Sequence, residues 1–326
     1  MHPQPPADRG EVGSTVADVG EFGIIRRVTE GRRQPASTLL GPGDDAAVVA
    51  ASDGRVVATT DVLVLDVHFR LDWSSPELIG RKAVAVNLAD IAAMGARPTA
   101  VLVGLACPAD TPAALLDELS SGMWTEASAA GAGLVGGDLV TARQLVISIT
   151  ALGDLEGRRP MTRAGARPGD VVAIAGRLGW SAAGLVVLGR GFRSPVSVVG
   201  AHRCPEPPYR AGPQAADAGA TSLIDISDGL LADLGHVAAA SGVRLDVRTD
   251  QLEVAPRLRE VGSALGADAL HWVLTGGEDH ALAATFPAEV ALPEGWRAIG
   301  TAGEGHGVTV DGETYGGPGG WEHFRH

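Results

Sequence analysis

The sequence predicts a protein of two domains that mixes α-helices with β-strands. Its 326 residues are enough for two domains, each with a buried core. A pattern of strand, acidic turn and helix occurs once in each half, at residues 56–91 and 223–241. Between the halves, residues 156–170 are rich in Arg, Gly and Pro, as is typical of a boundary. We therefore expect domains at 20–155 and 156–326, preceded by a disordered extension over 1–19.

In the first half, a short buried strand over Val56–Thr60 should deliver Asp61 at its C-terminal end. Pro76 then opens a helix that Gly95 and Pro98 stop, and Asn87 and Asp90 should share one face of it. The further elements expected are a strand at 99–106, an amphipathic helix at 112–130, a turn at 136–138 and a strand at 144–153.

In the second half, the expected elements follow in a similar alternation. They are a strand at 171–175, a helix at 181–189, an irregular proline-rich segment at 190–213, a strand at 223–226 and a helix at 230–241. The remainder alternates short strands with polar loops, one of which holds the glycine-rich turn 276–279.

The aspartates stand in unusual surroundings, because most have Gly, Ala, Ser, Thr or aliphatic neighbours and no adjacent Lys or Arg. They are Asp44, Asp45, Asp61, Asp66, Asp90, Asp138, Asp225 and Asp228. Two carboxylates about 5 Å apart repel by roughly 3 kcal/mol at an effective dielectric near 20. Lys82 is the only lysine, so the chain has few cations of its own to offset that repulsion. Hard divalent ions take oxygen ligands, so the pattern predicts Mg²⁺ and, through it, phosphate chemistry.

Each motif of the first half also has an ordinary structural interpretation. GPGDDAAVV (41–49) could be a plain turn, since Gly and Asp are the commonest turn residues. Thr59, Thr60 and Asp61 form a cluster of oxygens, and such residues need partners in a buried strand. Asp90 is placed in mid-helix, where a capping role is excluded, and this favours a partner charge or a metal.

Among the later motifs, DISDG (225–229) is the most specific, because three oxygen-bearing side chains surround a helix start where a cap needs one. VGGD (135–138) is a simple turn or a backbone cradle for phosphate. GGED (276–279) is weak alone. Arg163 is a solvated residue or a phosphate clamp, and His68 is a structural histidine or a substrate contact.

Composition excludes several classes of function. A net charge of −13 argues against non-specific binding to nucleic acid or anionic membranes, but not against a phosphorylated substrate. Cys107 and Cys204 are too few for a disulfide framework or a zinc site. The first ten residues lack the apolar core of a signal peptide, and no apolar run would span a bilayer, so the cytoplasm is expected. With one lysine, no Walker loop fits, and no Rossmann fingerprint appears.

Taken together and in order, the motifs resemble those of the thiamine-monophosphate kinase family. The shared segments are GEFGII (20–25), GPGDDAAVV, TTDVLVLDVHF (59–69), KAVAVNLADIAAMGARP (82–98), GGDLV (136–140), MTRAG (161–165), GWSAAGL (179–185), IDISDGLLADLGH (224–236) and LTGGEDH (274–280). Single motifs also occur in aminoimidazole-ribonucleotide synthetase, selenophosphate synthetase and hydrogenase-maturation enzymes, whereas the full set is specific to the kinase.

The resemblance implies an α+β fold of the aminoimidazole-ribonucleotide synthetase type, dimerising through paired N-terminal sheets. It also implies ATP-dependent, Mg²⁺-dependent phosphorylation of thiamine monophosphate, the last step of thiamine diphosphate biosynthesis, by direct transfer without a catalytic side chain. By position, it implies a shell for several Mg²⁺ ions of Asp45, Thr59, Thr60, Asp61, Asp90, Asp138, Asp225 and Asp228. The implied ATP contacts are Gly137, Asp138, Arg163 and Ser227, and the implied substrate contacts are His68, Glu278 and Trp321. The chain departs from the family at His280 and Ala281, where Tyr-Glu is frequent.

Two alternatives stay open at this point. The first is another ATP-using enzyme of the same superfamily. A selenophosphate synthetase would want a reactive cysteine before Cys107, and a hydrogenase-maturation enzyme a C-terminal cysteine where this chain has His326. The second is a non-catalytic nucleotide- or metal-binding protein on the same fold, which we would expect to have lost some of the aspartates.

Overall fold

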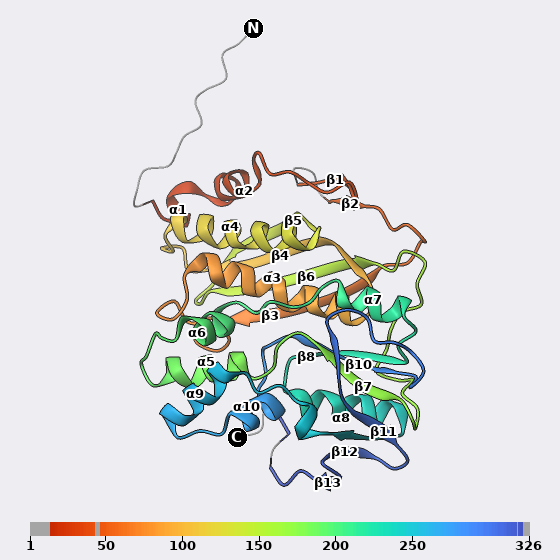
Figure 1. Cartoon of the computed structure of the whole chain (residues 1–326). Coiled ribbons are helices and arrows are strands. Elements are labelled where there is room, and N and C mark those ends of the chain that lie inside the picture. Colours follow the sequence, from red (N-terminus) through yellow and green to blue (C-terminus); the bar gives the residue numbers. More distant parts are fainter. Residues whose placement is uncertain (1–13, 43–45, 318, 322–326) are drawn as a thin grey trace.

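The computed structural model describes residues 14–42, 46–317 and 319–321. Two sheets with their helices are stacked one above the other (Figure 1), a four-stranded sheet in the first half and a seven-stranded sheet in the second. Helices and strands are mixed within each half, so the predicted α+β class is confirmed. Among the described residues, no helix is long and apolar enough to cross a membrane.

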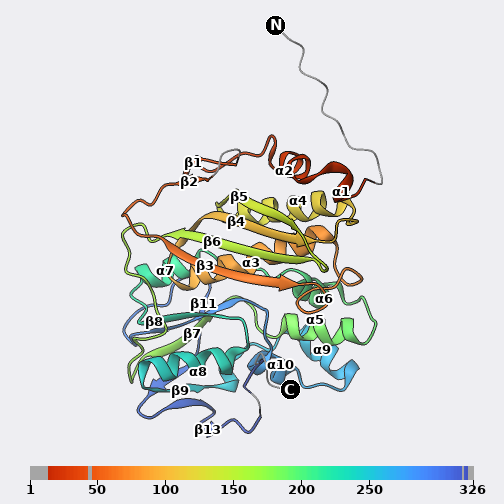
Figure 2. The ribbon, with the colours of Figure 1, turned by 180° about the vertical axis from the view of Figure 1, so that it is seen from behind.

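The N-terminal sheet has the strand order β3-β6-β4-β5. Its strands are β3 (Val57–Val64), β4 (Arg97–Cys107), β5 (Gly133–Thr141) and β6 (Val146–Asp154). Only β4 and β5 pair in parallel. Helices α3 (Pro76–Ala93) and α4 (Ala113–Ala130) cover one face, and the opposite face is bare in Figure 2. Two short helices, α1 (Val16–Val19) and α2 (Glu21–Thr29), and the hairpin of β1 (Thr38–Leu40) with β2 (Val48–Val49) complete this half.

Helix α3 is the central element of the molecule. Ser75 caps it by accepting a hydrogen bond from the Leu78 N–H, and Pro76 occupies its first turn. Almost every residue from Ile79 to Ala93 is buried, so the helix is covered on all sides rather than along one stripe. It packs against α4 and the four-stranded sheet, and it also contacts β8 and α7 of the other half. Residues of α3 can therefore reach both halves of the chain.

The C-terminal sheet has the order β13-β12-β9-β11-β7-β10-β8. Its strands are β7 (Val171–Ala175), β8 (Ser222–Ile226), β9 (Arg244–Val247), β10 (Ala281–Phe286), β11 (Trp296–Gly303), β12 (Gly307–Val310) and β13 (Glu313–Thr314). The helices are α5 (Trp180–Gly189), α6 (Val196–Arg203), α7 (Ala211–Asp217), α8 (Leu230–Ser241), α9 (Pro256–Leu265) and α10 (Ala269–Thr275), with a 3₁₀ turn at Thr249–Gln251. One sheet face packs on α5 and α8–α10, and the other on α7 and the end of α3.

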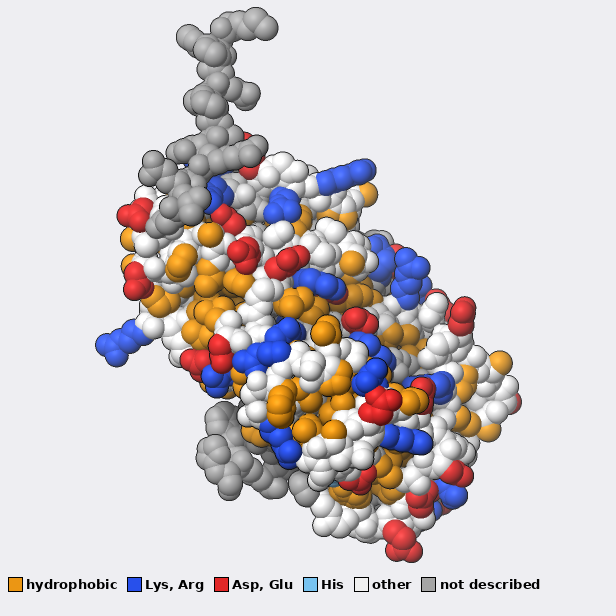
Figure 3. All heavy atoms as spheres, turned by 60° about the vertical axis from the view of Figure 1, so that its left-hand side comes forward, with side chains coloured by type: hydrophobic (Ala, Val, Ile, Leu, Met, Phe, Trp, Pro, Cys, Tyr) orange, Lys and Arg blue, Asp and Glu red, His pale blue; other side chains and the backbone are white. Residues whose placement is uncertain are grey.

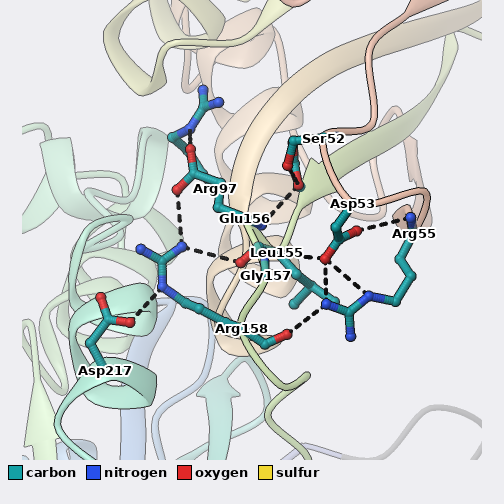
Figure 4. Close-up of polar contacts among 10 residues, drawn as sticks. Ser52, Asp53, Arg55, Arg97, Leu155, Glu156, Gly157, Arg158 and Asp217 are labelled. Carbon is teal, nitrogen blue, oxygen red and sulfur yellow. Dashed lines mark hydrogen bonds and ion pairs between the residues drawn. The ribbon is translucent and has the colours of Figure 1, made fainter.

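The change from one sheet to the other falls between Asp154 and Val171, and its first residues are tied to both halves (Figure 4). Arg97 donates to Glu156 over 2.7 Å, which fixes the segment to β4. Arg158 donates to Asp217 of α7 over 2.8 Å. Because these ion pairs are partly exposed, they orient the connecting segment but add little to the free energy of unfolding. On the face shown in Figure 3, basic side chains are interspersed with Asp and Glu.

Several predicted elements need correction. Asp61 does not end its strand, because β3 stays in register with β6 as far as Val64. Residues 136–138 are not a turn but the middle of β5, which pairs with β4 through a bulge. There, a Cβ on Gly137 would lie 2.1 Å from the Val103 carbonyl oxygen, so strand packing alone requires that glycine.

Two segments expected to be irregular are helical. Residues 190–213 contain α6 and the start of α7, because buried Val198 and Val199 pack into the core beside α5. Residues 16–19, expected to be part of a disordered extension, form α1, where Thr15 and Asp18 make a reciprocal capping box.

Candidate active site

Acidic residues from both halves converge where α3 and β3 meet β8. Asp61 lies in β3, Asp90 in the last turn of α3 and Asp225 in β8. Thr59 donates its hydroxyl to the Asp90 carboxylate over 2.8 Å, and the Asp61 N–H donates to the Asn87 side-chain oxygen over 2.9 Å. Asn87 and Asp90 thus share the helix face toward β3, as predicted. Asp90 is not in mid-helix, and a carboxylate in the last turn faces the negative end of the helix dipole.

Burial and neighbouring carboxylates raise the pKa of Asp61 and of Asp90. Burial raises the pKa of Asp90 to about 7, with further contributions from Asp225 and Asp61. Although residue Asp61 is exposed, the atoms around its carboxylate desolvate it and raise its pKa, and Asp225 adds to this. His280 Nδ1 lies 3.2 Å from the Asp225 carboxylate. Burial opposes the charged imidazole, but the hydrogen bond to Asp225 raises the pKa of His280. Further positive charge would relieve this repulsion.

The donor set suits a hard divalent cation, since it consists of carboxylate and hydroxyl oxygens. Within the part of the chain that the structure describes, however, no three His, Cys, Asp or Glu side chains are close enough to hold a metal ion. Asp45, which was predicted to belong to the metal shell, lies outside the described residues. The described residues therefore include the types of ligand that Mg²⁺ prefers, but they are not grouped closely enough to form a complete site.

At the start of α8, a residue that the sequence analysis missed accounts for the capping. Asp233 accepts hydrogen bonds from the Asp228 and Gly229 N–H groups, each over 3.1 Å. Burial, followed by the Asp225 charge, raises the pKa of Asp233 to about 7. Capping therefore does not explain the side chains of Asp225 and Ser227 in the DISDG motif. The sequence does offer a signal for this cap, since Asp233 follows Gly229 of the DISDG motif by four residues.

The DISDG and GGED motifs pack against each other through their backbones. A Cβ on Gly277 would lie 2.5 Å from the Ser227 carbonyl oxygen, so only glycine permits this approach. The Glu278 N–H donates to that same carbonyl over 2.7 Å. The Trp321 N–H donates to the Asp228 carbonyl over 2.9 Å. Three predicted contacts, Ser227, Glu278 and Trp321, are thus brought together from distant parts of the sequence.

A second polar cluster lies beside the acidic one. The Lys82 ammonium is 3.2 Å from both Glu278 carboxylate oxygens and donates to the His68 carbonyl over 3.1 Å. His202 Nδ1 is 3.4 Å from Glu278 and 3.1 Å from the Ser181 hydroxyl. Burial would raise the pKa of Glu278, but Lys82 and then His202 hold it below its usual value. Lys82 therefore contacts both predicted substrate positions, His68 through its backbone carbonyl and Glu278 through its carboxylate, while the His68 ring accepts a hydrogen bond from the Val64 N–H over 3.1 Å.

Comparison with known proteins identifies the family. Residues 43–155 match the family described as "AIR synthase related protein, N-terminal domain". A thiamine-monophosphate kinase of Mycobacterium tuberculosis is 54% identical over 312 residues, which are 95% of this chain and 93% of that relative. The chain belongs to the thiamine-monophosphate kinase family. A Corynebacterium glutamicum member is 43% identical over 323 residues, covering 96% of both chains. A solved structure, "AaThiL complexed with AMPPCP and TMP", has a TM-score of 0.79 and 32% identity, covering 96% of this chain and 100% of that one.

Not every position predicted from the thiamine-monophosphate kinase resemblance joins the clusters. Asp138 aligns with Gly104 and Ser148 across the sheet and alternates with buried Leu139, so it lies on the face opposite to Asp61. Thr60 points to that opposite face too, and its hydroxyl donates to the Ile149 carbonyl over 2.9 Å. One protomer therefore does not bring the whole predicted metal shell together.

The remaining ATP positions are also separate. Gly137 neighbours Asp138 within β5. Arg163 is exposed in the connection between the sheets, where its carbonyl accepts a hydrogen bond from the Ser241 hydroxyl over 3.1 Å.

Proposed function

We propose that this chain transfers the γ-phosphoryl group of ATP to thiamine monophosphate, completing thiamine diphosphate in the last step of its synthesis. The observation that supports the proposal best is the convergence of Asp61, Asp90 and Asp225 beside the polar cluster in which Lys82 contacts His68 and Glu278. The names of the relatives and the ATP-analogue complex of the solved member support the same reaction.

Two free, buried cysteines, Cys107 and Cys204, support a reducing compartment such as the cytoplasm.

In this proposal, the acceptor's own phosphate oxygen is the nucleophile. It is already anionic, so no side chain has to act as a general base. Mg²⁺ would neutralise the phosphate charges, held by the proposed ligands Asp45, Thr59, Thr60, Asp61, Asp90, Asp138, Asp225 and Asp228. We assign ATP contacts to Gly137, Asp138, Arg163 and Ser227, and acceptor contacts to His68, Glu278 and Trp321.

An ATP-consumption assay with thiamine monophosphate, thiamine and an aminoimidazole-ribonucleotide precursor side by side tests the activity. We expect ATP turnover and thiamine diphosphate formation with thiamine monophosphate alone. Turnover with the aminoimidazole precursor instead would favour a different enzyme of the same superfamily. No turnover with any acceptor, from protein that binds ATP, would favour the non-catalytic alternative.

We also propose that the active form is a homodimer in which two N-terminal sheets pair through their bare faces. Val62 and Val140 lie on this face and are 48% and 50% exposed. Apolar side chains on a bare sheet face favour association with a partner. Because Asp138 and Thr60 lie on the same face, pairing would place them at the boundary between the two copies.

Val62→Asp should convert this dimer into monomers, because it places charge in the middle of an apolar interface. Sedimentation velocity at micromolar concentration measures the result. Val196→Asp is the matched control, since Val196 is 75% exposed on α6, away from the sheet face. We expect the control to remain dimeric. An unmodified chain that sediments as an active monomer would contradict the proposed dimer.

A further inference from the structure

We infer that Lys82, the only lysine of the chain, is a positioning residue that holds the two sides of the acceptor pocket together. The inference rests on the proposed function, which makes His68 and Glu278 the acceptor contacts. His68 belongs to the N-terminal half and Glu278 to the C-terminal half, 196 residues from Lys82 in the sequence. Helix α3 lies between the halves and carries Lys82 to the point where they meet.

The geometry around Lys82 uses all of its hydrogen-bonding capacity. The residue is 4% exposed, and an ammonium group has three N–H donors. Three acceptor atoms surround it: both Glu278 oxygens at 3.2 Å and the His68 carbonyl oxygen at 3.1 Å. An ammonium buried in this way is stable only while its carboxylate partner is present. The ion pair therefore fixes Glu278 relative to the backbone of the His68 loop.

Glu278 is held on one side and open on the other. Its backbone has a φ of 62°, a left-handed conformation kept by the hydrogen bond from its N–H to Ser227. His202 lies 3.4 Å from the carboxylate and is itself 8% exposed. Nevertheless, 37% of the Glu278 side chain remains exposed. This exposed part of the side chain leaves room for an N–H donor or a positive charge of the acceptor beside the carboxylate.

This arrangement separates two kinds of carboxylate at the domain junction. Asp61, Asp90 and Asp225 repel one another and need added positive charge. Glu278 already has a cation, so its expected role is recognition of the acceptor rather than binding of a metal ion. Lysine suits this buried position because its ammonium is compact, whereas arginine would bring a larger, planar group into the same space.

The test compares Lys82→Met with the unmodified enzyme. We expect KM for thiamine monophosphate to rise roughly tenfold or more, as for loss of a charge-assisted contact, while KM for ATP changes by less than about twofold. Arg81→Met is the matched control: Arg81 is the neighbouring cation on α3 but pairs with Glu126 over 2.9 Å. We expect the control to leave KM for thiamine monophosphate unchanged.

A double variant separates positioning from a general structural role. If Lys82 acts through Glu278, Lys82→Met should raise KM by less than about twofold in a Glu278→Gln background. The inference would be overturned if the two substitutions multiplied each other's effect on KM for thiamine monophosphate. It would also be overturned if Lys82→Met raised KM equally for thiamine monophosphate and for ATP. If Lys82→Met does not fold, Lys82→Arg takes its place, because it keeps the positive charge and changes only the geometry of the contact with Glu278. The measurement is again KM for thiamine monophosphate compared with KM for ATP. An unmodified enzyme without activity on thiamine monophosphate would refute the proposed function, whereas an active enzyme with unchanged Lys82 variants would refute this inference alone.

Discussion

Asp61→Asn should abolish phosphorylation of thiamine monophosphate while leaving the protein folded. Removing an anionic oxygen from the proposed shell weakens Mg²⁺ binding, and we expect kcat to fall by roughly a thousandfold, equivalent to about 4 kcal/mol of transition-state stabilisation. Desolvation and Asp225 raise the pKa of Asp61 in the folded state. Its ionised form is therefore unfavourable there, and this destabilisation is fully present above the raised pKa. In metal-free buffer at pH 8, the free energy of unfolding should hold or rise.

Kinase assays at saturating Mg²⁺ and urea denaturation measure the two effects. Asp66→Asn is the matched control, because Asp66 lies just beyond β3 and is not among the proposed ligands. Its φ of 64° is one that asparagine tolerates well, so the control should fold and turn over normally. Substantial turnover by the Asp61 variant at saturating Mg²⁺ would remove that residue from the metal shell. Loss of stability in metal-free buffer would contradict the account of carboxylate repulsion.

Local spacing predicted the part of the site that lies on one helix and one strand. Asn87 and Asp90 are three residues apart, which puts them on one helical face whatever the rest of the fold does. Both face β3, where they meet Asp61 and Thr59. The prediction succeeded because a helix has a fixed period and because a buried carboxylate requires a partner.

Successive side chains of a strand point to opposite faces of the sheet, so residues that are adjacent in the sequence can lie on different faces. Thr59, Thr60 and Asp61 look like one cluster, yet a strand points Thr60 to the opposite face. Asp138 was expected in a turn because two glycines precede it. In β5 it instead faces away from Asp61, and Gly137 is explained by its approach to Val103. Sequence could not settle this, because glycine-aspartate pairs suit turns and bulged strands alike.

Contacts between distant segments were beyond prediction for a different reason. The pairing of Lys82 with Glu278 depends on how the two halves of the chain pack on either side of α3, and no local pattern encodes it. The isolated lysine was visible in the composition, but its partner was not. Asp233 is a different case, because its capping bonds are local and come from a residue four and five positions after the N–H groups rather than from a standard cap position. The resemblance to the kinase family predicts Glu278 as a substrate contact, and the structure adds its ion pair with Lys82.

Free thiamine should be a very poor substrate compared with thiamine monophosphate. In the proposed mechanism the acceptor phosphate binds through Mg²⁺ at a site lined by Asp61, Asp90 and Asp225, where the metal ions would offset the negative charges of both the phosphate and the carboxylates. An alcohol brings neither that charge nor an anionic nucleophile, and its proton would need a base. We expect kcat/KM to be lower for thiamine by roughly a thousandfold or more, since a set of charge-assisted contacts is lost.

Initial rates with both acceptors at equal ATP and Mg²⁺, corrected for ATP hydrolysis without acceptor, measure this ratio. Lys82→Met supplies an internal comparison, because it should weaken the proposed contact of Glu278 with the acceptor without removing a proposed metal ligand. The thousandfold preference should therefore persist in that variant even as KM rises. If His280, held against Asp225, acted as a base for an alcohol, thiamine would be used at a comparable rate. Comparable catalytic efficiency on the two acceptors would show that the acidic cluster does not act on the acceptor phosphate, and the direct-transfer mechanism proposed for this site would be wrong.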